Sequence, residues 1–198
     1  MTLPEISTAV DSSSQVQTLP EKVVCSAGFG VPGIAAKHPD FLAMSLANQV
    51  FGFGRSSRLA QRIRNEDGLT GAVESGYLER AGEGPLAIEV TISPMKIDPM
   101  VSAVRSEVER FQKDGISDLE LESVKKAIIN AYWVRLKSNR GLAQEFAFSE
   151  INQLGKDYVN SYPDLIAGIS RVQVLECLRK YLDFELGPKV IVGPYEKK

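Results

Sequence analysis

The chain has 198 residues, of which 43% are hydrophobic and 24% charged, and its formal net charge is −2. It is long enough to bury a core as one large domain or at most two small ones. The charge argues against a general nucleic-acid binder, and no apolar run approaches the roughly 20 residues of a membrane-spanning helix. The first residues lack the basic and apolar regions of a secretory signal peptide, so the compartment stays open, with the periplasm included if the chain derives from an exported precursor.

A single histidine, His38, limits the metal chemistry of the chain. A catalytic zinc site with two histidines and a glutamate, or with three histidines, cannot be assembled from this chain alone. His38 precedes Pro39 in the sequence "AAKHPD", which we interpret as a solvated loop rather than part of a Ser-His-Asp triad. We therefore predict no catalytic and no metal-binding residue in this chain. Cys25 and Cys177 leave the question of a disulfide open.

The N-terminal region predicts a linker and then a strand. Residues 1–20 are rich in Ser, Thr and Pro and predict a flexible lead-in or interdomain linker, which leaves residues 21–198 as a single domain. "KVVCSAGF" predicts a buried strand, and "GFGVPG" (residues 28–33) predicts a loop of small residues. The hexapeptide matches G-x-G-x-x-G, but a nucleotide-binding turn opens directly into a helix, and here Pro32 and "KHP" intervene.

Two helices and two strands are expected next. Asp40 can cap a helix through "FLAMSLANQVF", and Ser56 or Ser57 can cap a second one, "RLAQRIRNED", which Gly68 closes. Of the two strands that follow, "PLAIEVTISP" has the clearer alternation, with Leu86, Ile88, Val90 and Ile92 on one face. This alternation predicts a sheet with one buried face.

The rest of the chain is predicted to be mainly helical. Asp98 and Pro99 resemble an N-cap and first helical residue, and "SDLE" at 117–120 is a capping box that opens a long helix. The buried stripe of that long helix is expected to include Leu121, Val124, Ile128 and Ala131. Arg140 and Gly141 are candidates for an interruption, Ser170 and Gln173 form another capping box, and "KVIVG" predicts a final strand. The fold class is therefore α+β, with a largely antiparallel sheet and helices packed on one face.

Arg64 stands on the last turn of a basic helix, before a glycine stop and a new strand. Leu59 and Ile63 are expected to face the core, and we assign Arg55, Arg58 and Arg62 to the solvent side. Arg64 lies between the two faces, close to where the strand begins. Its guanidinium can therefore reach a peptide carbonyl or carboxylate along the edge of that strand.

The segment "VFGFGRSSRLAQRIRNEDGLTGAV" (residues 50–73) resembles the C-terminal domain of pitrilysin/insulinase-type zinc metallopeptidases. The resemblance rests on this pattern: a glycine, "SSRL", an "IR" pair, an acidic residue and "GL" leading into a strand. The resemblance extends over about residues 22–194, through "HPDFLAMSLANQVFG", "DGISDLELESVKKAI" and "VIVGP". The family includes the mitochondrial processing peptidases and bacterial zinc proteases.

The resemblance implies one half of a two-domain unit whose other half carries zinc on an H-x-x-E-H motif. In the family, the non-catalytic half positions the substrate peptide through an arginine and a tyrosine. The arginine matches Arg64. The tyrosine position holds Gly71, which has no hydroxyl to donate to an oxyanion. Tyr77 is a candidate substitute, although an ordinary strand residue is the simpler interpretation.

The resemblance leaves two hypotheses. In the first, the chain is the non-catalytic half of a zinc endopeptidase. It then completes the cavity for a peptide substrate beside an H-x-x-E-H partner domain, with zinc in the partner and Arg64 as the substrate-binding residue. In the second, it is an inactive scaffold subunit of the same fold, as the loss of tyrosine at position 71 suggests. Both hypotheses are compatible with a homo-oligomer. An anion-binding or nucleic-acid-binding module built on the arginine cluster is disfavoured by the overall charge.

Overall fold

Five strands form one mixed sheet in the computed structural model, which describes residues 14–70, 72–77, 84–182 and 189–196. The strands are β1 (Ser14–Thr18), β2 (Cys25–Pro32), β3 (Ala72–Tyr77), β4 (Pro85–Ile92) and β5 (Lys189–Gly193). Their order in the sheet is β1-β5-β2-β4-β3. Only the β1–β5 pair among them is parallel, so the predicted largely antiparallel sheet is confirmed.

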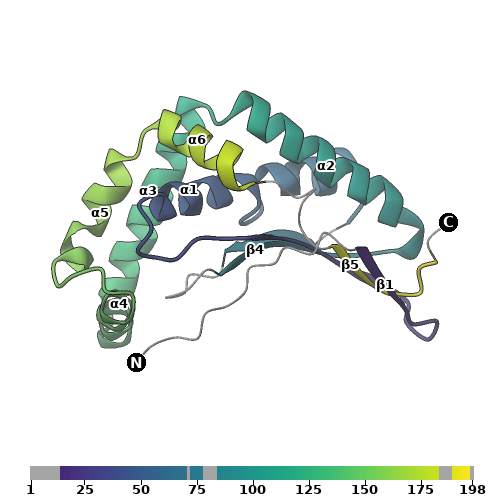
Figure 1. The fold of residues 1–198 in the computed structure, drawn as a ribbon, viewed down its shortest axis with the longest axis horizontal. Helices are drawn as coiled ribbons and strands as arrows, with labels where there is room; N and C mark the ends of the chain where they lie inside the picture. The colour runs from purple at the N-terminus through teal and green to yellow at the C-terminus, as the bar shows by residue number, and fades with distance from the viewer. Residues whose placement is uncertain (1–13, 71, 78–83, 183–188, 197–198) are drawn as a thin grey trace.

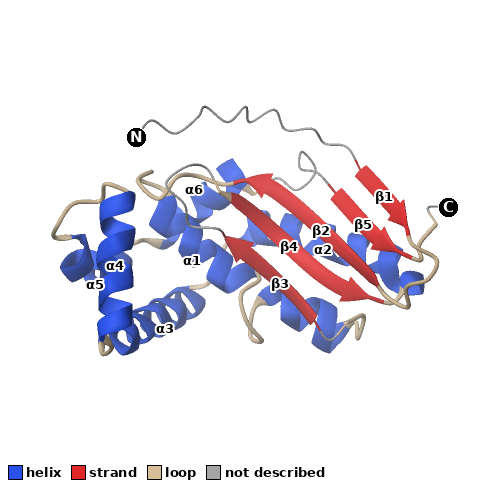
Figure 2. Cartoon of the chain, turned by 90° about the horizontal axis from the view of Figure 1, so that it is seen from below, coloured by secondary structure: helices blue, strands red, loops and turns tan. Residues whose placement is uncertain are grey.

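The helices lie on one side of this sheet. They are α1 (Phe41–Phe51), η1 (Ala60–Glu66), η2 (Pro94–Lys96), α2 (Ile97–Asp114), α3 (Asp118–Leu136), α4 (Asn139–Ile151), α5 (Tyr158–Gly168) and α6 (Arg171–Tyr181). Figure 1 shows α1, α2 and α6 above the sheet, while α3, α4 and α5 extend beyond its end. Seen from below, in Figure 2, the strands lie in front and the helices behind them. Within the described ranges, no helix is both long and apolar enough to cross a membrane.

The alternation of β4 determines which face of the sheet is covered. Leu86, Ile88, Val90 and Ile92 are each at most 3% exposed, as predicted. Glu89 and Thr91, between them, are exposed on the opposite face. Burying an apolar side chain of this size stabilises the fold by about 1.5–3 kcal/mol, so the face with the larger apolar residues packs against the helices.

The N-terminal predictions need two corrections. Residues 14–18, within the predicted flexible lead-in, form β1. Their polar side chains do not prevent strand formation, because β1 pairs with β5 through backbone hydrogen bonds. The predicted loop at 28–33 is wrong as far as Pro32, because β2 continues through Gly28 and Gly30 to that residue. Both glycines are paired with β4. This pairing keeps the segment extended, although its glycine content predicted a loop.

The helical predictions hold best where a local cap defines them. Ser117 and Ser170 both form the predicted capping boxes. The helix predicted to start at Asp98 begins at Ile97, directly after η2, and the Asp98 carboxylate accepts a hydrogen bond from the Tyr195 hydroxyl (2.6 Å) instead of capping. The break predicted at residues 140–141 occurs at residues 137–138, just before α4, whose first turn is capped by Ser138 through the Gly141 N–H (3.0 Å).

The second half of α3 departs from the predicted buried stripe. Leu121 is buried and Val124 and Ile128 are half-buried, but Ala131 is exposed. Tyr132 is fully buried instead and donates a hydrogen bond to the Val159 carbonyl of α5 (2.7 Å). A different side of α3 is buried here, because this half of the helix lies beyond the sheet and packs against α4 and α5.

Candidate functional site

Arg64 lies on a short helix between α1 and β3. The helix begins after Ser57, whose hydroxyl accepts a hydrogen bond from the Ala60 N–H (3.3 Å), and it ends before Gly68, which has a φ of +58°. Leu59 and Ile63 are fully buried and fix the helix on the core, as predicted. Its residues 60–66 form a widened π-type turn, a feature often found at functional sites.

Arg58 is a structural residue, which corrects its assignment to the solvent side. Its Nε and Nη2 atoms each donate to a carboxylate oxygen of Glu120 at 2.9 Å, and its Cζ lies 4.7 Å from the centroid of the Phe111 ring. The Arg58 side chain is only 17% exposed. The hydrogen bonds from Arg58 lower the pKa of Glu120 to about 2. This bidentate pair holds the Arg64 helix against α2 and the start of α3.

Arg62 is also paired, but at the surface. Its guanidinium lies 3.4 Å from Glu66 and 3.1 Å from Asp67. Both partners are acidic residues within five positions of Arg62 in the sequence. Arg62 does not line the hollow that Arg64 faces, so it serves as a matched reference for it.

Arg64 and Arg55 line the same hollow of about 600 Å³ over the free face of the sheet. Arg64 is half-buried, and Arg55 is exposed on the turn after Gly54, which has a φ of +80°. Within the described part of the chain, neither guanidinium forms an ion pair. The helix of Arg64 contacts β3, the edge strand, so its side chain reaches the hollow beside that strand, as expected from the sequence. Arg55 is exposed, as its assignment to the solvent side expected, but its place beside Arg64 in this hollow was missed.

The floor of the hollow consists of neighbouring residues on four strands. One row runs from Val192 through Ser26 and Thr91 to Ala72, and the next runs from Val190 through Gly28 and Glu89 to Glu74. A side chain at Gly28 would meet no atom within 4 Å, so the floor is open at its centre. The alternation that predicted the buried face of β4 also places Glu89 and Thr91 here, and this signal could have located the hollow.

Tyr77, the candidate substitute for the tyrosine of the family pattern, has structural contacts. Its hydroxyl donates to the Ile34 carbonyl (2.7 Å) and accepts from the Ile34 N–H (3.1 Å). Its ring packs on Phe41, with the centroids 5.6 Å apart. These contacts bind the end of β3 to the segment after β2. Gly71 lies outside the described residues.

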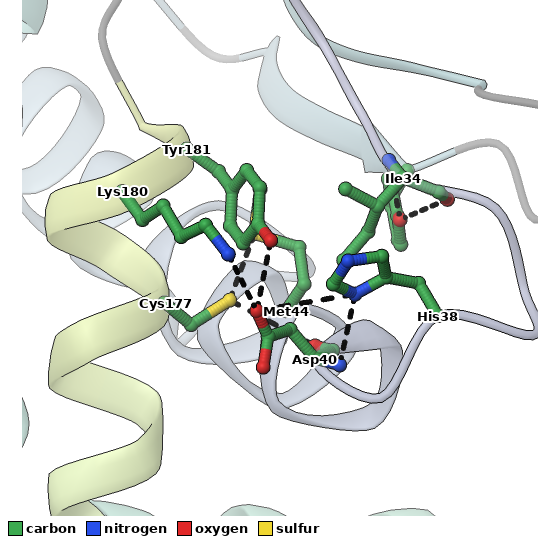
Figure 3. Close-up of polar contacts among 8 residues, drawn as sticks. Ile34, His38, Asp40, Met44, Cys177, Lys180 and Tyr181 are labelled. Carbon is green, nitrogen blue, oxygen red and sulfur yellow. Dashed lines mark hydrogen bonds and ion pairs between the residues drawn. The ribbon is translucent and has the colours of Figure 1, made fainter.

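A second polar cluster joins the start of α1 to α6 (Figure 3). The Asp40 carboxylate accepts hydrogen bonds from Tyr181 (2.8 Å) and Lys180 (3.3 Å), so it does not cap α1 as predicted. The hydrogen bond from Tyr181 is the main cause of the lowered pKa of Asp40. His38 accepts a hydrogen bond from the Asp40 N–H at its Nδ1 atom (3.1 Å), which fixes the loop, and its side chain is 36% exposed.

Cys177 lies beside this cluster without the properties of a nucleophile. Both Cys177 and Cys25 are buried free thiols, which answers the question of a disulfide. Burial raises the pKa of Cys177 to about 12, so the thiol stays protonated at neutral pH. The cluster in Figure 3 therefore joins α1 to α6 and is not a catalytic triad.

The described residues do not fit a zinc ion. Nowhere in the ranges that the structure describes do three His, Cys, Asp or Glu side chains gather as a metal site would require. His38 already uses Nδ1 as an acceptor.

Comparisons with known proteins agree on one family. The model of the peptidase M16 inactive domain matches residues 4–128. An uncharacterized zinc protease of Mycobacterium bovis is 26% identical over 181 residues, which cover 90% of this chain and 40% of the relative. The chain spans at most 40% of the length of the curated relatives that it matches, which are named zinc proteases.

Solved structures show the same fold. A peptidase M16 inactive domain from Pseudomonas fluorescens superposes with a TM-score of 0.88 at 23% identity, covering 99% of this chain and 47% of that one. An inactive peptidase domain from Bordetella parapertussis has a TM-score of 0.68 at 15% identity, covering 82% and 88%. The family model spans more than half of the sequence, and the chain belongs to the peptidase M16 inactive-domain family.

Proposed function

We propose that this chain is the non-catalytic half of a zinc-dependent endopeptidase. In this role it completes the substrate cavity, and Arg64 positions the peptide for a partner domain that carries H-x-x-E-H and zinc. The chain spans less than half of its zinc protease relatives, which leaves room for such a domain in a longer protein or in a separate subunit. The observation that carries the proposal is the guanidinium of Arg64, which faces an open hollow without an ion-pair partner among the described residues.

The chemistry of Arg64 suits a peptide substrate. Its planar guanidinium can donate two hydrogen bonds to a carbonyl or carboxylate. The buried Leu59 and Ile63 and the Arg58–Glu120 pair hold its helix in place, so little ordering is needed on binding. Its role is to orient the peptide, and the bond-breaking groups lie in the partner.

The test is cleavage of a quenched peptide by the assembled peptidase, either the full-length protein or the complex with the H-x-x-E-H subunit. Arg64→Ala should lower kcat/KM about 10- to 100-fold, because a hydrogen bond to a charged group contributes about 1.5–3 kcal/mol. Arg62→Ala is the matched control and should leave kcat/KM unchanged. Equal values for the two variants would remove Arg64 from the site.

A second candidate is a scaffold subunit without a proteolytic role, favoured by glycine at position 71 in place of the family's tyrosine. The same assay separates it from the first. An assembly that contains the H-x-x-E-H domain and zinc but cleaves no peptide would support the scaffold.

A further inference from the structure

Four charged side chains line the hollow over the sheet. Arg55 and Arg64 come from the helix side, and Glu74 and Glu89 come from β3 and β4. Glu74 and Glu89 are directly opposite each other in the antiparallel register. Like charges in this position destabilise a sheet, so the pair is not explained by the fold.

None of these four side chains forms an ion pair within the described part of the chain. Arg58 and Arg62, on the same helix, are both paired with carboxylates. Arg55 and Arg64 share their hollow with two carboxylates and yet lie more than 4 Å from both. Two cationic and two anionic groups therefore line one hollow without forming an ion pair with one another.

The hollow has room for an extended chain over its strand floor. The hollow has a volume of about 600 Å³, and Gly28 leaves its floor without a side chain between Glu89 and Val190. Successive side chains of an extended peptide point to opposite sides. A peptide in the hollow thus presents one residue to the arginines and the next to the glutamates.

We propose that this hollow selects extended peptides in which an acidic residue stands next to a basic one. Arg55 acts with Arg64 on the acidic side chain, and Glu74 with Glu89 receives the basic side chain. The inference deepens the proposed function and rests on it. A free inorganic anion is a poorer ligand, because the two glutamates repel it, whereas a peptide can carry both charges.

The experiment compares four quenched peptides of equal length that differ only in two adjacent residues: Glu-Lys, Glu-Gln, Gln-Lys and Gln-Gln. Binding of uncleavable forms of the same peptides to the assembled peptidase is measured alongside by fluorescence anisotropy. The wild-type protein should favour Glu-Lys over Gln-Gln by about tenfold or more in kcat/KM and in affinity.

Single variants assign the two halves of this preference. Arg55→Gln should abolish the advantage of the acidic residue and keep that of the basic one, while Glu89→Gln should do the reverse. Arg55→Lys keeps the charge and should keep part of the acidic preference. Arg62→Gln, outside the hollow, should keep both.

Two outcomes overturn the inference: equal cleavage and binding of the four peptides by the wild-type protein, or a charge preference that persists in both Arg55→Gln and Glu89→Gln. If Arg64→Ala still lowers cleavage of all four peptides, the proposed function survives that failure. If binding follows charge as predicted but the assembly cleaves nothing, the charge inference stands and the peptidase proposal falls.

Discussion

The two faces of the sheet use the same strands under opposite constraints. On the covered face, β2 and β4 present Phe29, Leu86 and Ile88, each at most 4% exposed. On the free face, alternate residues of the same strands are Gly28, Glu89 and other small or polar groups. Packing determines the covered face, because the helices leave no room for change there. The charged side chains that line the hollow on the free face form no ion pair within the described structure, and this is why we propose a ligand for them.

Substitutions at two adjacent residues of β4, one on each face, should show the largest difference in the free energy of unfolding. Ile88→Ala removes a fully buried side chain and should cost about 2–5 kcal/mol in the free energy of unfolding. Glu89→Gln changes an exposed residue and should stay within about 0.5 kcal/mol of the wild-type protein. Urea denaturation of both variants measures the contrast. Similar losses at the two positions would mean that the free face is also packed.

Two glycines extend the comparison. At Gly52, an added Cβ would overlap the hydroxyl of buried Ser75 and lie 2.9 Å from Leu59, so Gly52→Ala should cost about 1–3 kcal/mol of stability. At Gly28, the same methyl group meets nothing within 4 Å, and Gly28→Ala should be neutral or stabilise by up to about 1 kcal/mol. Thermal unfolding reports both. A strongly destabilised Gly28→Ala would contradict an open floor.

Acid should weaken the attachment of the Arg64 helix to α3. The folded-state pKa of Glu120, about 2, is below its ordinary value of 4.5, so the Arg58–Glu120 pair contributes stability in full above pH 4.5. This contribution is lost as the pH falls from 4.5 to 2. Because the Glu120 side chain is about one-third exposed, we expect only about 1–2 kcal/mol.

The check is the stability difference between the wild-type protein and Glu120→Gln, measured by urea denaturation across this pH range. It should be greatest above pH 4.5 and shrink toward pH 2. A constant difference would show that the charge of Glu120 is not the stabilising element.

The smallest effect is expected at Tyr77. Tyr77→Phe removes both hydrogen bonds to Ile34 and should cost about 1 kcal/mol of stability, because the packing of the ring on Phe41 remains. Peptide cleavage by the assembled peptidase should not change, since the hydroxyl does not line the hollow over the sheet. Loss of kcat/KM without loss of stability would instead assign Tyr77 to the substrate.

Local sequence patterns predicted the elements that depend on local contacts. The alternation of β4 and the capping boxes at Ser117 and Ser170 are confirmed because each is determined within a few residues. β1 could not be predicted, because its partner β5 lies at the other end of the chain. The same holds for Arg58, whose partner Glu120 is 62 residues away.

For the candidate site, the sequence indicated Arg64 as a candidate residue but did not show which other residues line the same hollow. Arg55 and Arg62 look alike in the sequence, and only the position of the hollow distinguishes them. Glu74 and Glu89 come from two strands, so only the register of β3 and β4 shows that they are opposite each other.

The parallel pairing of β1 with β5 also has a mechanical consequence. The described chain enters the sheet at the start of β1 and leaves it at the end of β5, and these two points lie at opposite ends of the same ladder. A force that pulls the two ends apart therefore shears the strands and loads all their hydrogen bonds together. Thr18 and Leu19 add two more bonds at the far end, to the Tyr195 and Gly193 carbonyls. If the domain is stretched along its chain, as during unfolding by a translocating machine, this pair of strands is the clamp that must yield first.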